Sequence, residues 1–101
     1  METFELASLL VRQGSEEWPV SFERARLFVI QQYGTFSWYI ELDGMQQEAL
    51  LRRFAESLDI DVSVQAVTVG GKSLSGDGFF HPNPQKRAAA VRGQGELGGY
   101  H

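Results

Sequence analysis

The fold is decided by the stretch Phe36-Ser37-Trp38-Tyr39-Ile40-Glu41-Leu42. Apolar residues occupy every second position of this stretch, and the positions between them hold a serine, a tyrosine and a glutamate. Strict alternation with period two is typical of a strand that buries one face and exposes the other. The stretch therefore predicts a half-buried strand whose exposed face carries Tyr39 and whose buried face carries Phe36, Trp38, Ile40 and Leu42.

The segment before this strand predicts its antiparallel partner. Val20–Tyr33 follows Trp18-Pro19, where the proline favours an extended backbone. The alternation of Val20–Tyr33 changes phase near Glu23-Arg24, which indicates a bulge or a kink. Gly34-Thr35 supplies a short turn, so we expect an antiparallel hairpin over residues 20–42.

A helix is predicted after this hairpin. In Met45–Leu58 the apolar residues recur at helical spacing on one stripe, made of Leu50, Leu51, Phe54 and Leu58. Asp43 precedes them and is of a residue type that caps helix N-termini. We expect a helix at about 45–58, packed on the sheet.

A second hairpin is predicted beyond the helix. Ile60–Val69 alternates between apolar and polar residues, and Gly70-Gly71 is a strong signal for a two-residue hairpin turn. Lys72–Phe80 is the predicted return strand, although Gly76 and Gly78 weaken it. The second hairpin then covers residues 60–80.

The two ends of the chain leave alternatives open. Glu2–Gln13 has an apolar face at helical spacing and a glycine after it, which favours a helix, and a strand is the alternative. In 84–92, Asn83-Pro84 and three alanines favour a helix, whereas small residues at alternate positions favour a strand. We prefer the strand because it would give the sheet another neighbour. Residues 98–101 are expected to form a frayed tail.

These elements predict a single α+β domain over residues 1–101. Its fold class is an antiparallel sheet of two hairpins, about 20–42 and 60–80, with a helix at about 45–58 packed on it. The N-terminal helix and the C-terminal strand are additions that the pattern leaves open.

Composition narrows the function classes. The chain has no cysteine, which excludes disulfides and thiolate metal sites, and no spacing of histidines and carboxylates predicts another metal or cofactor site. Nine basic residues face thirteen acidic ones for a net charge of −4, so we expect no nucleic-acid partner. The acidic start Met1–Glu5 is unlike a secretory signal, and no apolar run is long enough for a membrane helix. We therefore expect a cytoplasmic protein without a membrane partner.

The segment Gly76–Arg87 gathers unlike functional groups. Asp77, His81, Asn83 and Arg87 offer a carboxylate, an imidazole, an amide and a cation within a short stretch. Histidine is the natural proton carrier near neutral pH, and arginine can hold an anionic group. The alternative interpretation is that Gly-Asp-Gly and His-Pro-Asn-Pro only form turns. As a hypothesis, these four residues form a ligand-binding site, and Tyr39 is a separate surface aromatic available for a contact.

Two functional hypotheses follow from these observations. The first is a non-catalytic interaction or accessory module that binds another protein or a second copy of itself, with Lys72–Phe80 as an edge strand able to pair with a partner. It rests on a full core without a recognised catalytic motif. The alternative is a small-ligand-binding or enzymatic domain with its polar site around residues 76–87.

Overall fold

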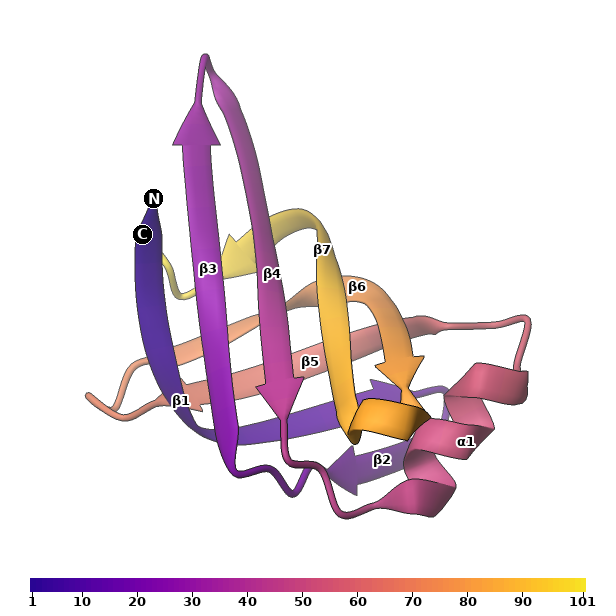
Figure 1. Cartoon of the computed structure of the whole chain (residues 1–101). Helices are drawn as coiled ribbons and strands as arrows, with labels where there is room; N and C mark the ends of the chain where they lie inside the picture. Colours follow the sequence, from indigo (N-terminus) through magenta and orange to yellow (C-terminus); the bar gives the residue numbers. More distant parts are fainter.

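The strand that contains Phe36–Leu42 is one wall of a closed barrel. The computed structural model describes all 101 residues. They form seven strands, one α-helix and a short 3₁₀ turn, and Figure 1 shows how these elements are arranged. In chain order the elements are β1 (Glu2–Gln13), β2 (Glu16–Pro19), β3 (Arg24–Gln32), β4 (Thr35–Asp43), α1 (Glu48–Glu56), β5 (Asp61–Thr68), β6 (Ser73–Asn83), η1 (Pro84–Lys86) and β7 (Ala88–Gly98).

Six strands close the barrel, and all neighbouring strands are antiparallel. Their order is β1-β3-β4-β7-β6-β5, and β5 returns to β1. Strand β1 closes the ring because its first residues pair with β3 and its later residues pair with β5. The remaining strand, β2, adds to the end of β1. The predicted fold class, an open sheet of two hairpins, is therefore wrong: the molecule is a mostly-β barrel with one short helix.

The predicted N-terminal helix is also wrong, because Glu2–Gln13 is strand β1. The pairing of β1 with β5 shifts register between Leu6 and Ser8. This irregularity changes which parity points inward, so Leu6 and Leu9 are both buried although they are three residues apart. A spacing of three residues imitates a helix, and this explains why the apolar pattern favoured one.

The helix α1 is shorter than the predicted 45–58, and its residues Leu50, Leu51 and Phe54 face the core. Leu58 lies beyond its end and is fully exposed. Asp43 is the last residue of β4 and not the helix cap. Gln47 precedes the helix instead, and its side chain accepts a hydrogen bond from the Ser21 N–H at 2.8 Å and donates one to the Pro19 carbonyl at 2.9 Å.

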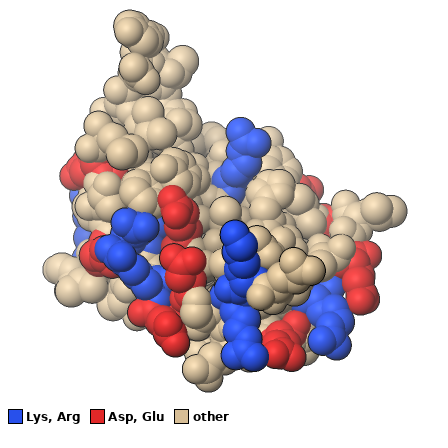
Figure 2. Space-filling view, in the orientation of Figure 1, with Lys and Arg blue, Asp and Glu red and all other residues tan.

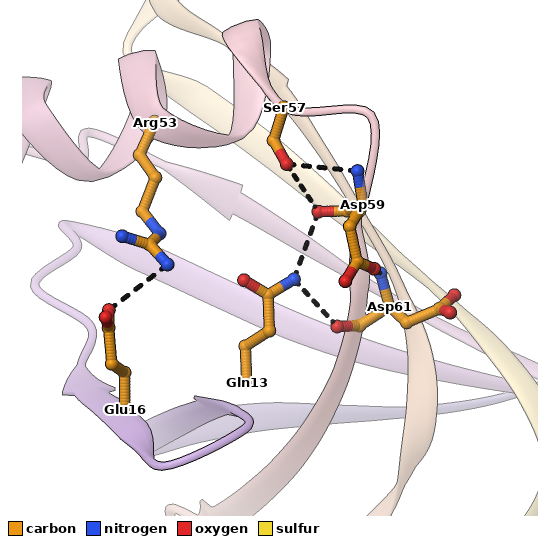
Figure 3. Close-up of polar contacts among 6 residues, drawn as sticks. All are labelled: Gln13, Glu16, Arg53, Ser57, Asp59 and Asp61. Carbon is orange, nitrogen blue, oxygen red and sulfur yellow. Dashed lines mark hydrogen bonds and ion pairs between the residues drawn. The ribbon is translucent and has the colours of Figure 1, made fainter.

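Polar contacts attach the C-terminal half of α1, and the residues that follow it, to the barrel, as Figure 3 shows. Arg53 forms an ion pair with Glu16 of β2 at 3.2 Å. The Gln13 side-chain amide donates to the carbonyl oxygens of Asp59 and Asp61, both at 3.0 Å. Because Gln13 ends β1 and Asp61 begins β5, this amide also joins the two strands that close the barrel.

Aromatic rings lie toward both ends of the barrel. Toward the α1 end, Phe54 contacts Phe80 with ring centroids 4.6 Å apart, and its other neighbour is Trp18 at 5.7 Å. A second aromatic group joins Tyr100 to Phe4 and Phe36, with centroids 6.3 and 5.7 Å away. No helix of the structure has the length and apolar character needed to cross a membrane.

Candidate functional site

The barrel interior is filled by side chains, which leaves the outer surface for binding. Trp38, Leu27, Ile40 and Phe80 are at most 2% exposed and belong to one continuous cluster of 22 buried residues. A six-stranded ring is narrow, so large inward side chains fill it without leaving room for a ligand. A binding site is therefore expected among the residues that point outward.

Strand β6 carries three of the sequence-predicted residues in one outward row. Asp77, His81 and Asn83 are all exposed, because alternate residues of a strand share a face. Asp77 accepts a hydrogen bond from the Ser63 hydroxyl at 2.8 Å, whereas His81 lies opposite Ala90 of β7. Four strand residues span roughly 13 Å, so the structure does not bring the His81 and Asp77 side chains together.

Arg87, the fourth of these residues, lies at a different place. It follows the 3₁₀ turn η1 with a left-handed backbone, φ 50°, and its guanidinium contacts Glu48 of α1 at 3.3 Å. Its carbonyl accepts a hydrogen bond from the Met45 N–H at 2.8 Å. Arg87 therefore joins the start of β7 to the start of the helix.

A shallow polar groove does include Asp77. Four of its lining residues lie in register on four neighbouring strands: Arg12, Ser63, Asp77 and Gln94. The groove encloses about 290 Å³, and Arg12 at its end is paired with Glu17 of β2 at 2.8 Å. Of the four predicted residues, Asp77 alone lines this groove.

Tyr39 takes part in a more continuous arrangement on the outside of β3 and β4. Its ring stacks on that of Phe28, its cross-strand neighbour, with centroids 4.7 Å apart and planes 17° apart. The Arg26 guanidinium lies 5.3 Å from the centre of the Phe28 ring. Phe28 points outward and yet is only 8% exposed, because these neighbours shield it.

The same row continues across β7 and β6. Arg92 is in register with Tyr39 on one side and with Phe79 on the other. We call the set Arg26, Phe28, Tyr39, Arg92 and Phe79 the aromatic–arginine row. The row crosses four paired strands, β3, β4, β7 and β6, of which β3, β4 and β7 lie side by side at the front of Figure 1.

Sequence reasoning identified Tyr39 of this row and missed the rest. A usable signal was present at Phe28, an aromatic residue that shares parity with Arg24 and Arg26 and so belongs to the polar face of its strand. Arg92 and Phe79 carried no such signal, because their place in the row depends on the pairing of β6 with β7.

The charge on this face is mixed. Arg26 is in register with Glu41, and Phe79 is in register with Asp61. Figure 2 shows basic and acidic side chains intermingled over the lower part of the same view. The four ion pairs of the structure use Arg12, Arg24, Arg53 and Arg87, so Arg26 and Arg92 of the row have no acidic partner within 4 Å.

The Tyr100 phenol, which follows β7, has a raised pKa. The Tyr100 hydroxyl donates to Glu2 at 2.5 Å, and this hydrogen bond is the main cause that raises the pKa of Tyr100 above 10.0. Desolvation and the Glu2 charge raise it further. Lys72 donates to the Tyr100 carbonyl oxygen at 3.0 Å, so the segment after β7 is bonded both to Glu2 of β1 and to the residue that precedes β6.

No group of three or more histidine, aspartate or glutamate side chains lies close enough together to hold a metal ion. No family model, curated protein or solved structure matches the chain.

Proposed function

We propose that the chain is a non-catalytic protein-interaction module and that the aromatic–arginine row is its contact surface. The observation that carries the proposal is the outward-facing stack of Tyr39 on Phe28, with Arg92 in register beside Tyr39. Aromatic residues and arginine supply most of the binding energy at protein interfaces. On this barrel they form one row across neighbouring strands.

The separation of the polar residues supports a non-catalytic role. General acid–base chemistry needs a proton carrier within hydrogen-bond reach of its partner. His81 is in register with Ala90, and Asp77 is hydrogen-bonded to Ser63 on the neighbouring strand. These groups lack the mutual contacts that a catalytic set requires.

The charges of the row favour a protein partner over a polyanion. Nucleic acids are held by clusters of cations, whereas Arg26 lies beside Glu41 and the chain carries a net charge of −4. Arg26 and Arg92 each lack an ion pair within the chain. A partner that presents an aromatic or aliphatic side chain to Tyr39 and a carboxylate to Arg92 would use both features.

The prediction that Lys72–Phe80 forms an edge strand is wrong. Lys72–Phe80 was expected at the edge of a sheet, but β6 is paired with β5 on one side and β7 on the other. Closing the barrel removes that edge. Contact through side chains of the outer face replaces pairing with the backbone of β6.

The test begins with a photo-reactive phenylalanine analogue at position 39 and, as a matched control, at Gln65, an exposed residue of β5. A protein cross-linked from position 39 and not from position 65 is then purified and titrated with the wild type and with Tyr39→Ala, Arg92→Ala and Gln65→Ala. We expect the first two changes to weaken binding by about tenfold or more and the third to leave it unchanged. Equal affinity for all four proteins would exclude the row as the contact surface.

A second candidate is a small-ligand site, favoured by the groove that holds Asp77. The Ser63–Asp77 hydrogen bond and the neighbouring Arg12 give the groove both an acceptor and a donor. A fragment library can be screened by backbone-amide NMR against the wild type and Asp77→Asn. Shifts around Ser63 and Asp77 that disappear in the variant would favour this candidate, and their absence would leave the groove without support.

A further inference from the structure

The hairpin formed by β3 and β4 extends beyond the barrel. Strand β1 accompanies β3 up to Val29, and β7 accompanies β4 from Tyr39 onward. Between these points the cross-strand pairs are Ile30 with Ser37, Gln31 with Phe36 and Gln32 with Thr35. We call residues 30–37 the hairpin tip. It projects at the top of Figure 1 as two strands with no third strand beside them.

The free strand edges of the hairpin tip carry no charged residue, no proline and no bulge. Exposed edges are normally blunted by charged residues, proline or bulges, because unpaired backbone groups can bind another strand. The segment from Leu27 to Ile40 contains no charged residue and no proline, and the register of β3 with β4 is regular throughout. Figure 2 shows the projecting part free of charged side chains.

Tyr33 adds a second observation at the same place. It is 96% exposed and has a positive φ of 53°, followed by Gly34 at φ 78°. Two successive positive φ values define a turn that asparagine, aspartate or glycine adopts readily and a tyrosine does not. The backbone of Tyr33 is therefore strained, and its exposed ring stacks on no other aromatic ring of the chain. Residues with such backbone strain often lie at sites that bind a ligand or a partner.

We propose that the hairpin tip pairs with the hairpin tip of a second copy of this chain. Each copy carries a net charge of −4, so contact between the charged bodies is opposed by repulsion. Within β3 and β4 the nearest charged residues are Arg26 and Glu41, four residues from Ile30 and from Ser37, or roughly 13 Å away. On the neighbouring strands, Glu2 is in register with Val29 and Arg92 with Tyr39, so the charges nearest the tip lie at its base and none lies on its free edges. Two uncharged strand edges can pair without burying an unpaired charge, and a second copy of this chain presents such an edge. This surface is separate from the aromatic–arginine row, so the two proposals stand or fall independently.

The free edges are short, which predicts weak and concentration-dependent association. The inward face of the tip is already in use, since Phe36 contacts Tyr100 and His101. Pairing therefore involves only the backbone edges and Tyr33. Such a small interface is typical of transient complexes.

Sedimentation equilibrium over a wide range of concentrations tests the proposal. The weight-average mass of the wild type should rise from 11.3 kDa toward twice that value. Gln31→Lys and Ser37→Lys place a charge on each strand of the tip, and at least one of them should keep the mass at that of the monomer. Gln65→Lys is the matched control, because it adds the same charge on β5, which has a partner on both sides.

Amide NMR of the wild type provides a reading that does not depend on any variant. Its concentration-dependent shifts should be confined to residues 30–37. A mass that stays at 11.3 kDa at every concentration overturns the proposal. So does a dimer that persists in both tip variants, or one that Gln65→Lys weakens as much as they do.

Discussion

The Trp38 indole lies directly against Gly93 inside the barrel, and a Cβ built on Gly93 would come within 2.2 Å of the ring. Gly76 approaches the same ring, with a Cβ distance of 2.7 Å. Two glycines on neighbouring strands thus give the largest side chain of the core its space. Gly76 weakened the strand prediction for Lys72–Phe80, whereas in the structure both glycines leave space for the Trp38 ring inside the closed barrel.

Gly93→Ala should destabilise the protein by about 1–3 kcal/mol, because the added methyl group overpacks the core at Trp38. Urea unfolding followed by circular dichroism measures the change. Gly70→Ala is the matched control, since its Cβ would meet nothing closer than 3.8 Å. In Trp38→Phe/Gly93→Ala the loss should be smaller than the sum of the two single changes. Additive losses would show that the indole is not what the methyl group meets.

Trp38→Phe by itself should cost less than a usual truncation of a large core residue. The Trp38 Nε1 group is buried and has no hydrogen-bond partner. Leaving a buried donor unpaired costs about 1–3 kcal/mol, and phenylalanine removes that donor. We expect Trp38→Phe to be less destabilising than Phe80→Leu in the same urea experiment. A larger loss for Trp38→Phe would mean that the volume of the indole outweighs its unpaired N–H.

The Phe28–Tyr39 stack should be visible as a coupling between the two residues. Stacked aromatic pairs contribute about 0.5–1.5 kcal/mol beyond the area they bury. A double-mutant cycle of Phe28→Leu and Tyr39→Leu, followed by thermal or urea unfolding, measures this coupling. A cycle of Tyr33→Leu with Phe28→Leu serves as the control, because Tyr33 is exposed at the hairpin tip. A coupling near zero in the first cycle would indicate that the stack adds nothing to stability.

Tyr33→Asn should stabilise the monomer by about 0.5–1 kcal/mol, because asparagine tolerates a positive φ better than tyrosine does. Tyr33→Val should have the opposite effect, since a β-branched residue fits this backbone worst. Both are measured by urea unfolding at a concentration where the protein is monomeric. Equal stability of the two variants would show that the turn relaxes to another conformation.

Sequence reasoning predicted most of the local elements correctly, but it missed strand β1 and the closure of the barrel. Alternation identified the strand within β4 and the one within β5, and Gly70-Gly71 marked the turn between β5 and β6. Barrel closure depends on pairing β1 with β5, residues from distant parts of the chain, and the register shift in β1 concealed its alternation. In β7, Ala88-Ala89-Ala90 offers no contrast between apolar and polar faces, so helix and strand could not be separated.

The residues of the candidate surface could likewise be predicted only where they lie within a single strand. Alternation within one strand was enough to assign Tyr39 to the outer face, where the structure has it. The rest of the row comes from cross-strand register, which joins Phe28, Tyr39, Arg92 and Phe79 from four strands. The segment 76–87 looked like a cluster because its polar residues are close in sequence, but a strand spreads alternate side chains along its length.

The Tyr100–Glu2 hydrogen bond predicts how stability depends on pH in the alkaline range. The hydrogen bond to Glu2 raises the pKa of Tyr100 above 10.0, its ordinary value. A raised folded-state pKa means that the neutral phenol is favoured by folding. Its contribution is therefore fully present below about pH 10, the unfolded-state pKa, and is lost as the pH rises through the folded-state pKa. The wild type should accordingly lose its advantage over Tyr100→Phe in urea unfolding across that window.

Absorbance of the phenolate, taken as the difference between the wild type and Tyr100→Phe, isolates the titration of this residue. Glu2→Gln keeps an acceptor for the hydroxyl and removes the negative charge, so the Tyr100 pKa should move back toward 10.0 in that variant. Glu5→Gln is the matched control, because it removes the same charge from β1 at a residue that is paired with Arg24 instead. If Glu5→Gln lowered the Tyr100 pKa as much as Glu2→Gln, the general charge of β1 and not the neighbouring Glu2 carboxylate would be the cause.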